Sequence, residues 1–221
     1  MNIKKVRNFI KSGVFKIKTF ICDNTDKKQN CLILLPGRFG SALHIMHLYE
    51  SAVLEETTLV GIEPENEWYP LPNGVGDQQD SILGMKKTRK ILSKTIHKIQ
   101  KHLGFTSRQV ALVGFSAGGV MAIQCAIHTQ ERFAGVVVHS GAILQPRKIP
   151  PTRFADLPFL LIHNRQDECF SWDERYIPMK KALLKRGYLV QTIERDSPEY
   201  SHNLSNEDII SATSFINRLW N

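Results

Sequence analysis

A Gly-x-Ser-x-Gly motif spans residues 114–118, between a short apolar run and a run of small and apolar residues. This order predicts a strand, a tight turn at Ser116 and a helix, the arrangement of a nucleophile elbow. Such a turn strains the backbone and crowds its neighbours, so small residues must flank the serine, as Gly114, Gly118 and Gly119 do. The alternative is a glycine-rich turn with a solvent-facing serine, but the strand pattern before it and the helix pattern after it favour the elbow.

Further apolar runs with the length of buried strands alternate with helical patterns along the chain. Besides the run before the motif, strands are expected at residues 14–21, 31–35, 58–62, 133–139, 158–163 and 189–194. Helices are expected at 80–103, from the elbow to about 130, from 173 to before 187, and after Ser205. Alternating strands and helices predict an α/β fold with a mostly parallel central sheet and helices on both faces. The stretch 140–157 is too short for a separate lid domain.

Length and composition predict a single domain over 1–221, with an N-terminal basic segment and strand hairpin in 1–30. No run approaches the ~18 apolar residues of a membrane span, and no continuous apolar segment follows the basic N-terminus, which argues against a secretory signal. The four cysteines fit neither a metal-site spacing nor a disulfide scaffold. Cys22 and Cys31 could face each other across a hairpin, but reduced thiols and a cytoplasmic location are expected.

The net charge of +8 is concentrated in two segments, the first 30 residues and residues 86–101. The second segment holds lysines and an arginine but no acid. Such a cluster can attract nucleic acid or anionic lipid. No aromatic interleaving and no nucleic-acid motif accompany it, so a solvated helix face is favoured and no nucleic-acid partner is expected.

A serine hydroxyl becomes a good nucleophile only when a base takes its proton and a third group orients that base. In α/β architectures of this kind the order along the chain is serine, acid, histidine. Of the histidines that follow Ser116 in the chain, His202 is the one expected in a loop, between the last strand and the last helix. Asp167, in the loop after strand 158–163, is the preferred acid. Glu168 and Asp196 remain alternatives, Asp196 being the stronger because it lies closer to His202 along the chain.

At these residues the chain resembles the phospholipase/carboxylesterase family of small α/β-hydrolases, which includes the acyl-protein thioesterases. The resemblance covers most of the chain from about residue 31, and rests on segments 34–40, 114–119, 162–167 and 201–202. It implies an α/β-hydrolase fold without a separate lid domain, with Ser116, Asp167 and His202 as the catalytic triad. It also implies an oxyanion hole from the backbone N–H groups of Arg38 and Ala117. Such enzymes need no metal or cofactor and cleave small-molecule carboxylic esters or thioesters.

The substrate pocket is less well defined than the triad. The loop 63–76 carries large side chains that form either a packed surface loop or a pocket wall. The predicted pocket residues are Phe39, Trp68, Tyr69, Leu71, Cys169 and Phe170.

Two rival interpretations remain beside the serine hydrolase. The related dienelactone hydrolases use a cysteine nucleophile, whereas position 116 is a serine. The other rival is a catalytically silent binding module that keeps the fold and uses its basic surface. The physiological substrate, ester against thioester, the acyl-chain length and the oligomeric state (monomer or homodimer) stay open.

Overall fold

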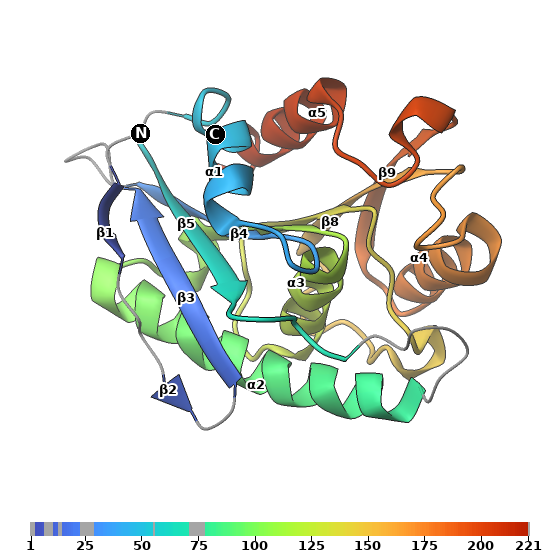
Figure 1. The fold of residues 1–221 in the computed structure, drawn as a ribbon, viewed down its shortest axis with the longest axis horizontal. Helices are drawn as coiled ribbons and strands as arrows, with labels where there is room; N and C mark the ends of the chain where they lie inside the picture. Colours follow the sequence, from blue (N-terminus) through green and yellow to red (C-terminus); the bar gives the residue numbers. More distant parts are fainter. Residues whose placement is uncertain are drawn as a thin grey trace.

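A mostly parallel β-sheet forms the centre of the protein (Figure 1). The computed structural model describes residues 3–6, 11–12, 15–22, 29–54, 56–70 and 78–220. The strands are β1 (Ile3–Val6), β2 (Lys11–Ser12), β3 (Phe15–Cys22), β4 (Asn30–Leu35), β5 (Thr57–Pro64), β6 (Val110–Phe115), β7 (Gly135–His139), β8 (Pro158–Asn164) and β9 (Leu189–Arg195). The helices are α1 (Ala42–Glu50), α2 (Gln78–Leu103), α3 (Ala117–His128), α4 (Ile177–Lys185) and α5 (Asn206–Asn217).

Within the described residues, the nine strands run in the order β1-β3-β5-β4-β6-β7-β8-β9, with β2 paired to β3. All neighbours from β5 to β9 are parallel, whereas β1, β2 and β5 each pair with β3 in the antiparallel sense. The expected mostly parallel central sheet is therefore confirmed. Because the central strands are parallel, the loops that follow them gather at one edge of the sheet.

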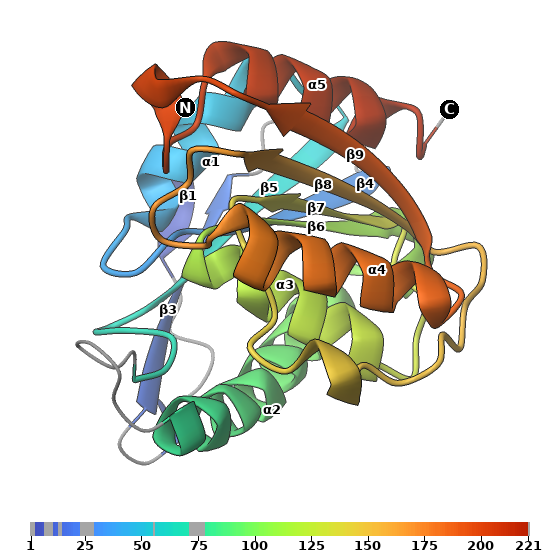
Figure 2. The same cartoon turned by 90° about the vertical axis from the view of Figure 1, so that its right-hand side faces the viewer.

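Helices cover both faces of the sheet (Figure 2). On one face α2, α3 and α4 pack against a core that includes Leu92, Met121 and Met179. On the other face α1 and α5 pack against a second core that includes Met46 and Phe215. Alternate residues of the inner strands feed the two cores, which is why β4 and β6 are almost continuously apolar.

The long helix α2 matches its predicted bounds to within two residues, and Gly104, with φ of 79°, ends it in the left-handed conformation. The lysines at 86, 87, 90, 94, 98 and 101 are exposed along it, as expected for a solvated face. None of the helices in the described segments has both the length and the apolar character needed to cross a bilayer. Residues 140–157 contain only a short 3₁₀ turn, Pro146–Lys148, and form no separate lid.

Helix α1 is absent from the sequence-based expectations. Its signal was present, because the Ser41 side chain caps the helix by accepting a hydrogen bond from the His44 N–H (3.4 Å), and residues 42, 45, 46 and 49 are buried at helical spacing. The helix lies directly on β5. A Cβ added at Gly61 would lie 2.5 Å from Met46 Sδ, so this strand position needs a glycine.

One arrangement considered for the N-terminal region, with Cys22 opposite Cys31, does not occur. Cys22 and Cys31 do not face each other across a hairpin, because β5 lies between β3 and β4 in the sheet. In the register, Cys22 is opposite Leu59 and Cys31 is opposite Thr58, both of which belong to β5. Short-range sequence patterns predict strands at β3, β4 and β5, but they do not show that β5 lies between β3 and β4 in the sheet. Residues 23–28 of the expected turn lie outside the described residues.

Candidate active site

Ser116 occupies the turn between β6 and α3 with φ of 54° and ψ of −123°. A non-glycine residue rarely adopts a positive φ, and the strain is of the kind that functional sites retain. The glycines around it allow a close approach of backbones. A Cβ at Gly114 would lie 2.3 Å from the Gly118 carbonyl oxygen, and one at Gly118 would lie 2.2 Å from the Leu35 carbonyl oxygen. Glycine at positions 114 and 118 therefore allows β4, β6 and α3 to approach closely at the elbow.

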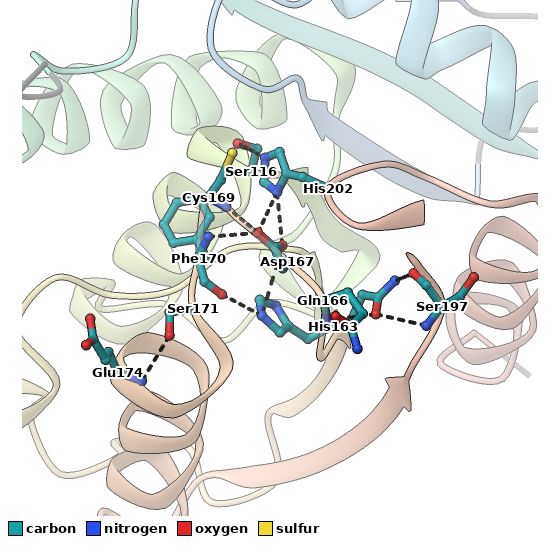
Figure 3. A network of polar contacts seen from close by, with 11 residues as sticks. Ser116, His163, Gln166, Asp167, Cys169, Phe170, Ser171, Glu174, Ser197 and His202 are labelled. Atoms are coloured by element: carbon teal, nitrogen blue, oxygen red, sulfur yellow. Dashed lines mark hydrogen bonds and ion pairs between the residues drawn. The ribbon is translucent and has the colours of Figure 1, made fainter. Parts of the chain in front are cut away.

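The structure brings Ser116, His202 and Asp167 together at the edge of the sheet where the parallel strands end (Figure 3). His202 Nε2 is 2.9 Å from Ser116 Oγ, and its Nδ1 is 2.9 Å and 3.0 Å from the two carboxylate oxygens of Asp167. With the ring proton on Nδ1, the imidazole donates to the carboxylate and accepts from the serine hydroxyl. This geometry can deprotonate the serine and stabilise the imidazolium that results.

Asp167 is held in its loop by the backbone. Its side chain is fully buried, and Oδ1 accepts hydrogen bonds from the N–H groups of Cys169 (2.9 Å) and Phe170 (2.7 Å). Burial alone would raise the pKa of Asp167, but the hydrogen bonds from His202 and Phe170 outweigh it and keep the pKa below its ordinary value. The carboxylate is therefore charged at neutral pH.

The two alternative acids lie elsewhere. Glu168 is exposed. Asp196 is also exposed and accepts a hydrogen bond from the Gln166 side chain (2.7 Å). Of these three carboxylates, Asp167 is the one that forms the hydrogen bonds with His202.

Asn164 links the loop of Asp167 to the loop of His202, a role that sequence reasoning missed. Its Nδ2 donates to the Ser197 carbonyl (2.6 Å), while Oδ1 accepts from the N–H groups of Ser197 (3.2 Å) and Gln166 (3.1 Å). One side chain thus ties together two loops separated by 33 residues. Nothing local in the sequence distinguishes this asparagine from a turn residue.

His163 also supports the loop that carries Asp167. Its ring stacks on Tyr176, with centroids 4.4 Å apart, and its Nε2 is 2.8 Å from the Phe170 carbonyl oxygen. Burial lowers the pKa of His163, so the neutral ring donates Nε2–H to that carbonyl. The acid loop is therefore anchored at both Asn164 and His163.

The loop after β4, residues 36–41, approaches Ser116 from the other side. A Cβ at Gly37 would lie 3.3 Å from Ser116 Cβ. The Trp68 indole N–H donates to the Pro36 carbonyl (2.8 Å), and the Arg38 guanidinium contacts Glu67 Oε2 through Nε (2.9 Å) and Nη2 (2.8 Å). The loop is thus held by two neighbouring residues of the β5–α2 connection, the segment for which the sequence left a packed surface loop and a pocket wall as alternatives.

The predicted pocket residues occupy different environments. Trp68 and Tyr69 are 1% and 2% exposed and belong to the core, so the packed alternative describes them better than a pocket wall. Leu71 lies outside the described residues. Phe39 is 72% exposed, with the Arg38 guanidinium 4.8 Å from its ring centroid.

Aromatic rings flank His202. The Phe170 ring lies 5.9 Å from the imidazole, and the Phe115 ring, which was not among the predicted pocket residues, lies 5.2 Å from it. Cys169 is exposed; partial burial of its thiol and the charges of Asp167 and Glu168 raise the pKa of the thiol.

Comparison with known sequences identifies the family. A sequence model of the phospholipase/carboxylesterase family matches residues 18–220, nearly the whole chain. The chain belongs to the phospholipase/carboxylesterase family. This agrees with the resemblance noted in the sequence.

Individual relatives in the phospholipase/carboxylesterase family are distant. The chain is 26% identical over 117 residues to acyl-protein thioesterase 1 homolog 2 of Dictyostelium discoideum, and the match spans about half of each chain (51% and 50%). The carboxylesterase of Bacillus cereus superimposes with a TM-score of 0.77 at 19% identity, covering 92% of this chain and 94% of the other. Acyl-protein thioesterase 2 of Zea mays gives a TM-score of 0.72 at 16% identity, covering 92% and 99%. These structures share the α/β-hydrolase fold.

Proposed function

We propose that the chain hydrolyses carboxylic esters or thioesters through a covalent acyl intermediate on Ser116. The observation that carries the proposal is the position of His202, whose ring lies within hydrogen-bonding distance of Ser116 on one side and Asp167 on the other. The strained serine turn and membership in the phospholipase/carboxylesterase family support the same conclusion.

In the first half of the reaction, Ser116 Oγ attacks the carbonyl carbon of the substrate while its proton passes to His202 Nε2. The charged imidazolium is stabilised by Asp167 through Nδ1–H. Collapse of the tetrahedral intermediate breaks the bond to the leaving alcohol or thiol, which takes the proton from Nε2. The acyl group then remains on Ser116.

In the second half, water attacks the acyl-serine with His202 again acting as the base. The carboxylic acid leaves, and the serine regains its proton. In both halves the negative oxygen needs donors, for which the backbone N–H groups of Arg38 and Ala117 are proposed. Such a donor contributes roughly 3–4 kcal/mol to transition-state stabilisation. Ala117 begins α3, and Arg38 lies on the loop that Trp68 and Glu67 hold next to the elbow.

A fluorophosphonate probe tests the nucleophile directly, because it labels only an activated serine. The wild-type protein should be labelled and should hydrolyse a p-nitrophenyl ester, and Ser116→Ala should lose both properties while keeping its melting temperature. Ser214→Ala, which removes an exposed hydroxyl on α5, is the matched control and should be labelled like the wild type. Labelling that persists in Ser116→Ala would contradict the proposal. A wild type that is never labelled but binds anionic polymers in a salt-sensitive way would favour the binding module.

The acyl group is best defined by a ladder of p-nitrophenyl esters of increasing chain length, assayed beside the matching thioesters. Among the predicted pocket residues, the exposed Phe39 and the ring of Phe170 beside His202 are the side chains proposed to contact it.

A further inference from the structure

Three potential metal ligands converge at the candidate active site. Asp167, Cys169 and His202 each offer one donor atom, and these three atoms lie within 4.8 Å of one another (Figure 3). Carboxylate, thiolate and imidazole are the ligand types that bind zinc in proteins. In a tetrahedral site with metal–ligand bonds of about 2.0–2.3 Å, ligand atoms are about 3.3–3.6 Å apart. The widest separation that this spacing allows, 4.8 Å, exceeds those values by about 1.2–1.5 Å.

Access and charge both suit a divalent cation. Cys169 is exposed and the His202 side chain is 19% exposed, so an ion reaches these two donors from solvent, with the buried Asp167 carboxylate behind them. Asp167 and a cysteine thiolate together neutralise the two positive charges, and the thiol proton is released to solvent on binding. Glu168, adjacent to the cysteine, adds negative potential at the entrance although the chain as a whole carries a charge of +8.

The donor set also selects among cations. Magnesium and calcium prefer sites built from oxygen ligands, whereas a sulfur and a nitrogen ligand favour zinc and its neighbours in the transition series. The other three cysteines are buried and lie outside this cluster.

We propose that Asp167, Cys169 and His202 form an inhibitory binding site for zinc or a similar thiophilic divalent cation. This inference rests on the proposed function, because it concerns the regulation of the same site. A cation at this position occupies a lone pair of the imidazole and a carboxylate oxygen. His202 then cannot accept the serine proton, and Asp167 no longer orients the ring.

The first test is zinc inhibition of ester hydrolysis, with each rate expressed relative to the same variant in the presence of a chelator. Wild type should be inhibited by zinc but not by magnesium. The inhibition constant for zinc should weaken at least tenfold in Cys169→Ser, because loss of a ligand should cost at least as much as the roughly tenfold loss seen when a residue that supports a ligand is removed. Cys125→Ser, which changes a buried thiol on α3, should respond to zinc like the wild type. Equal zinc sensitivity of Cys169→Ser and wild type would overturn the proposal, because inhibition would then need no thiol.

The second test does not depend on activity. Cobalt(II) should give a thiolate-to-metal charge-transfer absorption with Ser116→Ala, which keeps all three donors, and the band should be absent from the double variant Ser116→Ala/Cys169→Ser. Failure of the proposed function would appear as a wild type without hydrolysis, whatever the cobalt spectrum. An active enzyme without the charge-transfer band would refute the metal site alone.

Discussion

The stability of the protein should depend on pH through His139, which lies at the end of β7 beside the elbow. The His139 carbonyl accepts a hydrogen bond from the Ser116 N–H (2.9 Å), its side chain is 1% exposed, and its Nε2 is 2.6 Å from the Tyr49 hydroxyl. Burial lowers the pKa of His139 to about 4, with Asp208 opposing the shift and Arg195 adding to it. The folded protein thus holds a neutral imidazole at a pH where the unfolded chain is already protonated.

The size of the effect follows from the two pKa values. The ordinary value is 6.5 and the folded value about 4, a difference of about 2.5 pKa units. Each unit corresponds to about 1.4 kcal/mol, so protonation should lower the free energy of unfolding by roughly 3 kcal/mol in the acid limit. Because the unfolded chain takes up the proton first, the loss begins as the pH falls below about 6.5 and is complete below about 4. About 2 kcal/mol of it should appear between pH 7 and pH 5.

Urea denaturation of wild type and His139→Gln at pH 7 and pH 5 measures this term. The variant should be less stable at pH 7, because it disturbs the contact with Tyr49, but its loss between the two pH values should be about 2 kcal/mol smaller than that of wild type. His128 and His163, whose pKa values burial also lowers, contribute to both proteins and cancel in the comparison. His97→Gln, at an exposed position on α2, should keep the wild-type pH dependence. An identical pH dependence in His139→Gln and wild type would refute the reasoning.

Two further predictions concern catalysis. Asp167→Asn should lower turnover on the order of 10⁴-fold without unfolding the protein, whereas Asp196→Asn should leave turnover near the wild-type level. Steady-state kinetics on a p-nitrophenyl ester measures both effects, and the reverse result would assign the acid role to Asp196. Trp68→Phe removes the hydrogen bond that holds the loop of Arg38, so kcat should fall about tenfold, or about 1.4 kcal/mol, with little change in KM. Tyr69→Phe is the matched control, because the Tyr69 hydroxyl is buried without a hydrogen-bond partner among the described residues. Loss of this hydroxyl should leave kcat unchanged. A similar fall of kcat in both variants would indicate general loosening of the core instead.

Much of the fold and of the candidate site could be predicted from local sequence. The apolar runs of β4 and β6, the glycines around Ser116 and the helical periodicity of α2 are each imposed by the geometry of one element, so they appear in consecutive residues. The order serine, acid, histidine, with each residue in a connection after a strand, favoured residues that the fold brings together, because the ends of parallel strands meet at one edge of the sheet.

Other features depend on contacts between residues far apart in the chain, and only the tertiary structure decides them. The position of β5 between β3 and β4 depends on strand pairing, and neither sequence segment by itself encodes its partner. The choice of Asp167 over Asp196 depends on which carboxylate reaches an imidazole 35 residues from Asp167. Cys169 illustrates the difference: cysteine spacing along the chain gives no metal motif, yet folding places its thiol within 4.8 Å of donor atoms from Asp167 and His202. Local patterns specify elements, whereas the distances between side chains on different loops arise only when the whole core has packed.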